Sequence, residues 1–295
     1  MNVDDSISDG LPLESPRWKE LEHAFGEPAS TIQLIRELRE FVATGKGDYA
    51  QLRSRTLDES GSNLFHQQSR YTATIAAVPH FISLATRLPS ELRRHILYDV
   101  SWINWLGGNS WIEHHGVNNE FVTGRFVYDE DLITWYDAAI STAAKLAVNA
   151  LSEVQDENSD LWRQINLLKT ACGLNGSPHL ANLTHWFEER YPVCPNCNFK
   201  LYARYIDSGY IVWDAKLGYD PKSVASEAKF KVLPFSDQID ELHPIDLATL
   251  LRYTASPAMN LALEWVKSVH GTFSCPACKH EFRLPEDYGP PTLIK

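Results

Sequence analysis

Two Cys-Pro-x-Cys segments constrain this chain more than any other feature of its sequence. They are Cys194-Pro195-Asn196-Cys197 and Cys275-Pro276-Ala277-Cys278. A two-residue spacer lets both thiolates of a tight turn point at one ion, and proline after the first cysteine presets φ for such a turn. Two turns of this kind supply the four ligands of a structural zinc site. We therefore predict one structural zinc ion per chain, bound by all four cysteines of the two segments.

The two segments lie far apart in the sequence. The spacer between Cys197 and Cys275 has 77 residues, whereas a simple zinc ribbon separates its cysteine pairs by about 15–20. Strand-like residues precede each pair, and an apolar residue, Phe199 or Phe282, follows it. These surroundings predict a split ribbon, in which two cysteine knuckles meet in space around an inserted helical unit.

Two other interpretations of the cysteines are less suitable. Redox-active Cys-x-x-Cys pairs open a helix in a βαβ context, which neither pair does. A catalytic zinc keeps an open position and usually has His or a carboxylate among three protein ligands, so four thiolates do not favour catalysis. The fifth cysteine, Cys172, extends the apolar stripe of Leu161, Ile165 and Leu168 by one turn. We predict that it is a buried small hydrophobe.

Residues 15–190 show a succession of amphipathic helical patterns. Helices are expected over 15–26, 34–45, 48–57, 71–88 with a kink at Pro79, 92–106, 129–172 with a break near Asp156, and 180–189. Helix pairs repeating at intervals of roughly 35–45 residues are typical of HEAT-like or armadillo-like solenoids. No exact internal repeat is present, so a plain irregular helical domain is the alternative.

The pattern changes after Tyr191. A β-hairpin is expected over 199–213, helices return over 237–270, and strand-like segments at 271–274 and 281–284 flank the second cysteine pair. The predicted fold class is mainly α. The predicted domains are a disordered lead-in (1–14), a helical-repeat domain (15–190), a split zinc ribbon with inserted helices (191–284) and a tail (285–295).

Charge is divided unevenly along the chain. The 295 residues have a net charge of −11; residues 1–190 carry 26 Asp and Glu against 16 Lys and Arg, whereas residues 191–284 carry ten of each. The absence of a basic patch beside the cysteines disfavours nucleic-acid binding. An acidic helical part favours a basic protein partner. The acidic N-terminus does not resemble a secretory signal, and no run reaches the ~18 apolar residues of a membrane span. Paired cysteines suit a reducing compartment. We therefore expect a cytoplasmic protein without a membrane partner.

A second possible site lies in the helical part. The aperiodic segment 107–128 contains Glu113-His114-His115, and the polar residues His66 and His80 interrupt apolar surroundings. Together they define an alternative, an enzyme with a groove site near His66, His80 and the 107–128 loop. Adjacent histidines do not share a helix face, so packing or surface roles are the simpler interpretation. The sequence contains no phosphate-binding glycine loop, nucleophile elbow or dinucleotide fingerprint.

Several segments together resemble a family. The chain is similar to bacterial HEAT-like helical-repeat proteins of largely unknown function in three segments. These are Ser15-Pro16-Arg17-Trp18 to Gly26, His66-Gln67 with Tyr71, and Ala76-Ala77-Val78-Pro79-His80. In some of these a Cys-Pro-x-Cys knuckle is followed much later by a segment like Gly271 to Cys278. The resemblance implies a helical-repeat scaffold with an added zinc ribbon, and it implies no activity.

The sequence thus predicts a non-enzymatic, protein-binding scaffold with a structural zinc site. An immunity or antitoxin protein that binds a basic effector, such as a nuclease toxin, is one form of this function. The alternatives are the groove enzyme described above and a zinc-ribbon nucleic-acid binder.

Overall fold

The protein is described here from a computed structural model. The structure describes residues 9–21, 29–57, 65–66, 69–106, 130–153, 160–175, 180, 184, 189–206, 209–234 and 245–283. Within these residues the chain is mostly helical and has small antiparallel sheets, as the sequence predicts.

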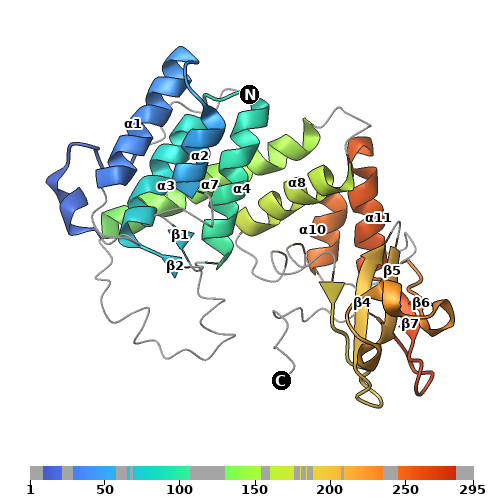
Figure 1. Ribbon diagram of the computed structural model, residues 1–295. Helices are drawn as coiled ribbons and strands as arrows, with labels where there is room; N and C mark the ends of the chain where they lie inside the picture. Colours follow the sequence, from blue (N-terminus) through green and yellow to red (C-terminus); the bar gives the residue numbers. More distant parts are fainter. Residues whose placement is uncertain are drawn as a thin grey trace. The chain divides into compact units, whose positions relative to one another are not determined.

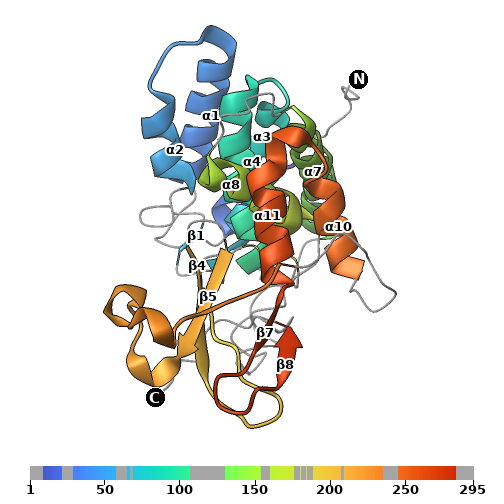
Figure 2. The ribbon, with the colours of Figure 1, turned by 90° about the vertical axis from the view of Figure 1, so that its right-hand side faces the viewer.

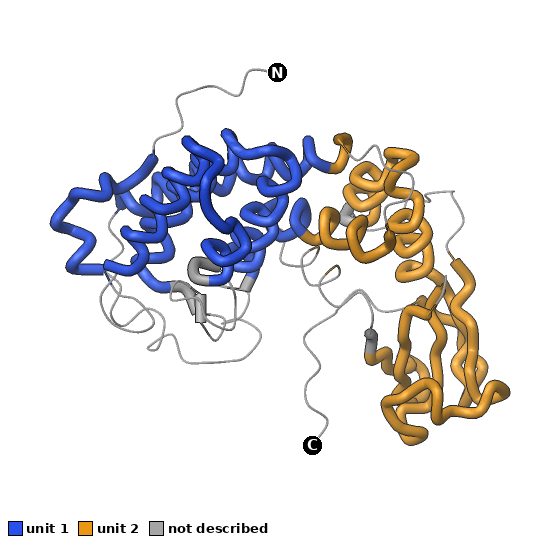
Figure 3. Tube along the Cα trace, turned by 45° about the horizontal axis from the view of Figure 1, so that its top comes forward, with its two compact units in different colours: residues 1–150, 170–177 blue, residues 151–169, 178–295 orange. Residues whose placement is uncertain are grey.

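The chain divides into two compact units (Figure 3). Unit 1 comprises Met1–Ala150 and Thr170–Ser177, and unit 2 comprises Leu151–Lys169 and Pro178–Lys295. The division therefore does not fall at Tyr191, where the sequence pattern changes, because residues 151–169 group with the later part of the chain.

Helices form most of the described part of unit 1 (Figure 1). They are α1 (Ala29–Thr44), α2 (Tyr49–Leu57), α3 (Thr72–Ala85), α4 (Ser90–Leu106) and α7 (Glu130–Ser152), whose last two residues belong to unit 2. The two-residue strands β1 (Phe65–His66) and β2 (Ser69–Arg70) lie between α2 and α3. Helix α1 ends where Gly45 adopts a φ of 67° and its N–H bonds to the carbonyl of Phe41. The Asp48 carboxylate accepts from the N–H of Gln51 in the first turn of α2. These caps confirm the helix boundaries predicted near residues 45 and 48.

Helix α3 is the core of unit 1. Every residue from Ala73 to Ala85 is buried, including the polar residue His80. Helices α1 and α4 both pack against α3. Pro79 lies inside α3 without splitting it into two helices. A half-buried ion pair joins α2 to α4, since Arg53 makes two 2.7 Å contacts with the carboxylate of the buried Asp99.

The N-terminal segment corrects two predictions. Residues 9–14 are part of the fold, not of a disordered lead-in, because Leu11 and Leu13 are buried. The helix expected from residue 15 to 26 is, in its described part, a short 3-10 helix (Pro16–Glu20) that ends at the extended residue Leu21. Trp18 is buried and its indole N–H donates to the Pro12 carbonyl, six residues earlier in the chain. This side chain therefore stabilises a compact turn around the short 3-10 helix.

Unit 2 combines helices with small sheets. The helices are α8 (Leu161–Leu174), whose last turn belongs to unit 1, α10 (Ile245–Tyr253) and α11 (Asn260–Val269). One sheet has the order β3-β4-β5-β6, formed by Glu189–Arg190, Leu201–Ile206, Gly209–Asp214 and Phe230–Lys231. Strands β7 (Thr272–Ser274) and β8 (Glu281–Arg283) form a separate hairpin, into which α11 leads directly (Figure 2). The predicted hairpin at 199–213 is thus confirmed as β4 and β5.

Helix α11 covers one face of the larger sheet. On that face Tyr210 and Val212 are fully buried, and the indole N–H of Trp265 donates to the Tyr210 hydroxyl over 3.2 Å. At the start of α11 the buried Gln164 side chain of α8 accepts from the N–H of Ala262. These contacts make the inserted helix α11 part of the sheet's core and join it to α8. Among the described residues no helix is both long and apolar enough to cross a membrane.

Candidate metal centre

The first cysteine segment forms a tight knuckle between β3 and β4. The N–H of Cys194 donates to the carbonyl of Phe199 over 3.0 Å, and the N–H of Asn198 donates back to the carbonyl of Cys194 over 2.9 Å. Asn198 has a φ of 55°, which closes the turn. Asparagine tolerates this left-handed conformation better than most residues.

The second segment repeats this geometry between β7 and β8. The N–H of Cys275 donates to the carbonyl of His280 over 2.8 Å, and the N–H of Lys279 donates to the carbonyl of Cys275 over 2.9 Å. Lys279 has a φ of 63°, matching Asn198 in the first knuckle. The two segments therefore fold into equivalent knuckles, which follows from their shared Cys-Pro-x-Cys pattern.

The knuckles bring all four predicted cysteines together. Their sulfur atoms lie within 4.8 Å of one another. Two pairs join the knuckles at 3.7 Å, namely Cys194 with Cys278 and Cys197 with Cys275. A metal–sulfur bond of about 2.3 Å in a tetrahedron separates the sulfurs by about 3.8 Å. A disulfide would require only about 2.05 Å. The cluster therefore fits four thiolate ligands around one metal ion.

The cysteines differ in exposure. Cys194 and Cys275 are fully buried, Cys278 is half-buried and Cys197 is exposed. The Asn196 side-chain amide reaches across from the first knuckle and donates to the Cys278 sulfur over 3.4 Å. This hydrogen bond, together with one from the backbone N–H of His280, lowers the pKa of Cys278 to about 6. The surroundings of this sulfur thus favour the thiolate, the form that binds metal.

A short backbone bridge also joins the two halves of the site. The N–H of Leu233, which follows β6, donates to the carbonyl of Thr272 in β7, and the N–H of Thr272 donates to that of Leu233. Gly271 lies at this crossing, where a Cβ atom would overlap the Leu233 carbonyl oxygen and lie 2.6 Å from Cγ1 of Val232. The rings of Phe273 and Phe282 pack against each other across the β7–β8 hairpin, with their centroids 4.5 Å apart.

Sequence reasoning missed this bridge and the Asn196 hydrogen bond. The only signals were Gly271 immediately before a strand-like segment, and asparagine in the first knuckle where the second has Ala277. Neither signal shows its partner, because the partners of Gly271 and Asn196 lie about 40 and 80 residues away along the chain.

The other candidate residues do not form a second centre among the described residues. His80 is 1% exposed and packs in the core of unit 1, so it does not line an open groove. The side chain of His66, the Glu113-His114-His115 group and the 107–128 loop lie outside the described residues, as does the tail. Cys172 is fully buried in α8, which confirms its prediction as a core residue.

Comparison with known proteins identifies no relative. No protein-family model matches the chain, and no curated protein or solved structure matches it significantly.

Proposed function

We propose that Cys194, Cys197, Cys275 and Cys278 bind one zinc ion, which has a structural role. The observation that carries this proposal is the closed donor set of four sulfur atoms from two equivalent knuckles. Four thiolates leave no ligand position open for a substrate, and soft thiolate donors suit zinc. A reducing cytoplasm, which we propose as the location, keeps the thiols available for the metal.

Metal analysis tests the zinc assignment. Freshly reduced protein is expected to contain about one zinc per chain, and Cys194→Ser or Cys275→Ser to lose the metal and destabilise unit 2. Cys172→Ser is the matched control, because this buried cysteine lies outside the cluster and its replacement leaves the metal content unchanged. Protein that contains no metal, or iron in place of zinc, would contradict the assignment.

We further propose that the chain is a non-enzymatic scaffold that binds a basic protein. Residues 1–190 carry a net charge of −10. Part of this charge lies on α7, where Glu130, Asp131 and Asp137 are exposed and Lys145 is the one basic residue. Consecutive described helices pack against one another, α1 with α2 and α3 with α4, and α1 also packs against α3; this stacking supports the HEAT-like or armadillo-like scaffold. An immunity or antitoxin protein that binds a basic effector, such as a nuclease toxin, is one form of this function, and the acidic charge is what favours a basic partner.

Partner binding is tested with the intact chain and lysates of its native host. One predominant basic protein is expected to be retained at low salt and released at higher salt. The triple variant Glu130→Gln, Asp131→Asn, Asp137→Asn is expected to weaken retention, whereas Lys145→Gln, the control on the same helix, is not. Equal retention by both variants would contradict an acidic contact through α7. Direct binding of DNA or RNA in a salt-dependent assay would favour the nucleic-acid alternative.

A further inference from the structure

The two knuckles are not equivalent in how they protect their exposed sulfur atoms. Asn196 of the first knuckle donates its side-chain amide to Cys278 of the second. The corresponding residue of the second knuckle is Ala277, which has no donor to offer to Cys197. Cys197 is also the cysteine with an exposed side chain, whereas Cys278 is half-buried. Exposure and the lack of a side-chain amide therefore coincide at one sulfur atom.

This asymmetry matters for the chemistry of a thiolate. A thiolate attacks an oxidant through a lone pair of its sulfur, and a hydrogen-bond donor on the sulfur, such as the Asn196 amide on Cys278, withdraws electron density from that lone pair. Access to the oxidant is the second requirement for oxidation. Both factors make Cys197 more reactive than Cys278, while Cys194 and Cys275 are fully buried.

A partner for an oxidised Cys197 is already in place. The sulfur of Cys275 lies 3.7 Å from that of Cys197, on the opposite knuckle. The Leu233–Thr272 bridge joins the halves of the module independently of the cysteines. The two sulfur atoms can therefore stay close while the ligand set changes.

We propose that Cys197 is a peroxide-sensitive modification site, at which oxidation links Cys197 to Cys275 and releases the metal. The inference rests on the proposed metal centre. The Cys197 thiolate attacks one oxygen of hydrogen peroxide; the O–O bond breaks, hydroxide leaves, and Cys197 becomes a sulfenic acid. The Cys275 thiolate then attacks the Cys197 sulfur, the S–S bond forms, and the S–O bond breaks with loss of a second hydroxide. Two thiolates and one peroxide thus give one disulfide and two hydroxides.

Loss of two ligands explains the release. Only Cys194 and Cys278 then remain to hold the ion, and two thiolates do not complete a structural zinc site. The disulfide keeps the knuckles joined, so the module retains a covalent link in place of the metal. Reduction of the disulfide restores the four ligands.

The experiment uses the full-length protein after its zinc content has been measured. Hydrogen peroxide is added, zinc release is followed with a chromogenic chelator, and free thiols are alkylated before digestion. Trypsin leaves Cys194 and Cys197 in the peptide Tyr191–Lys200, and Cys275 and Cys278 in Ser268–Lys279. A disulfide between the knuckles therefore joins two peptides, and fragmentation shows which cysteines it contains. We expect the Cys197–Cys275 disulfide to appear first and at the rate of zinc release.

Two exchanged variants test the asymmetry directly. Ala277→Asn places an amide donor opposite Cys197 and is expected to slow zinc release roughly threefold, because the donor weakens the attacking sulfur as a nucleophile. Asn196→Ala removes the donor from Cys278 and is expected to increase Cys194–Cys278 disulfide formation by a similar factor. Neither residue is a ligand, so both variants are expected to bind one zinc.

The outcomes separate this proposal from the metal assignment. Protein without zinc would overturn the proposed metal centre itself. Zinc-loaded protein that resists peroxide, forms Cys194–Cys197 first, or releases zinc at the same rate in both variants would leave the metal centre standing and overturn the proposed modification site.

Discussion

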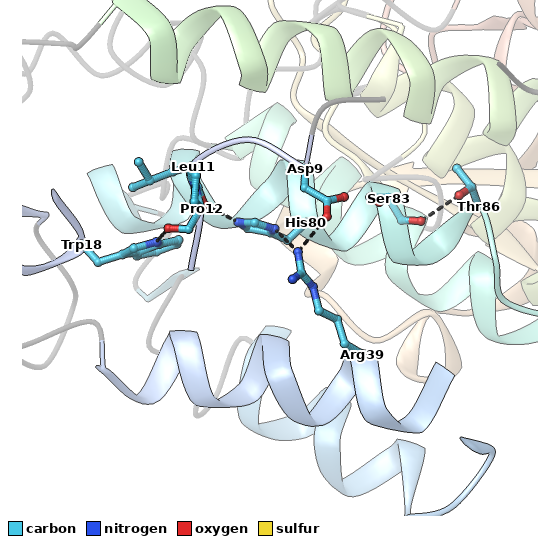
Figure 4. A network of polar contacts seen from close by, with 8 residues as sticks. All are labelled: Asp9, Leu11, Pro12, Trp18, Arg39, His80, Ser83 and Thr86. Carbon is cyan, nitrogen blue, oxygen red and sulfur yellow. Dashed lines mark hydrogen bonds and ion pairs between the residues drawn. The ribbon is translucent and has the colours of Figure 1, made fainter. Parts of the chain in front are cut away.

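At the scale of single residues, His80 shows how a buried ring fixes the N-terminal segment (Figure 4). Its Nε2 lies 2.9 Å from the Leu11 carbonyl oxygen, and its Nδ1 lies 3.0 Å from a guanidinium nitrogen of Arg39. A carbonyl can only accept and a guanidinium can only donate. Nε2 must therefore carry the proton and Nδ1 must accept, which defines a neutral ring. Asp9 pairs with the same guanidinium at 2.9 Å.

These contacts predict a loss of stability in acid. Burial lowers the pKa of His80 to about 4; the hydrogen bond to Leu11 opposes this effect and the Arg39 charge adds to it. An unfolded histidine has a pKa of about 6.5. Between these values the unfolded chain binds a proton that the folded chain does not, so this contribution is complete above pH 6.5 and decreases as the pH falls towards 4. The expected loss is about 3 kcal/mol of the free energy of unfolding.

Denaturant unfolding at a series of pH values tests this prediction. His80→Gln is expected to cost about 1–3 kcal/mol at pH 7.5 and to remove most of the pH dependence between 6.5 and 4. Trp18→Phe is the control, because it removes a hydrogen bond to the same segment without removing a titratable group. If His80→Gln retained the pH dependence of the unsubstituted protein, another group would be responsible.

At the scale of elements, the decisive contact is the crossing of β7 with the segment after β6. The Leu233–Thr272 bridge requires a close approach of two backbones, and Gly271 permits it. A Cβ atom added at Gly271 would meet the Leu233 carbonyl oxygen and the buried Val232 side chain. Neither of these can move aside as the end of a long, flexible side chain could.

Gly271→Ala is therefore expected to be destabilising. Overpacking of this kind costs about 1–3 kcal/mol, and the shift it forces on β7 is expected to weaken metal affinity, since Cys275 directly follows that strand. Gly209→Ala is the matched control, because a Cβ there meets only ordinary contacts at 3.7 Å and 4.0 Å. Equal metal affinity and stability in the two variants would show that the crossing does not position the knuckle.

At the scale of the whole molecule, the metal centre lies entirely within unit 2. The helices α1, α3 and α4 of unit 1 have a separate apolar core around α3. The stabilisation that a metal provides belongs to the part of the chain that folds around it.

Metal removal is therefore expected to affect the two units unequally. After chelation, backbone amides of β4, β7 and β8 are expected to exchange with solvent much faster, whereas those of α3 keep their protection. Hydrogen exchange with mass spectrometry, before and after chelation and again after zinc is restored, measures this difference. Uniform loss of protection in both units would show that unit 1 depends on the metal as well.

Much of this organisation is local and was therefore visible in the sequence. The apolar period predicted α1 and α4, and β-branched and aromatic residues around a turn predicted β4 and β5. The Cys-Pro-x-Cys pattern predicted two knuckles and their cysteines. These features depend on residues within a few positions of one another, since helix caps, hairpins and knuckles close their hydrogen bonds over short stretches.

The tertiary structure decided the rest. Leu11 and Leu13 fall in the predicted lead-in, an acidic segment without an apolar core; they are buried, and their segment is held by His80 of α3, which lies about 70 residues later and binds the Leu11 carbonyl. Likewise, the sequence by itself determined that four cysteines form two turns, whereas packing of α11 and the crossing at Gly271 decided that the turns face each other. Contacts of this kind join residues that only the folded chain brings together, so no local pattern records them.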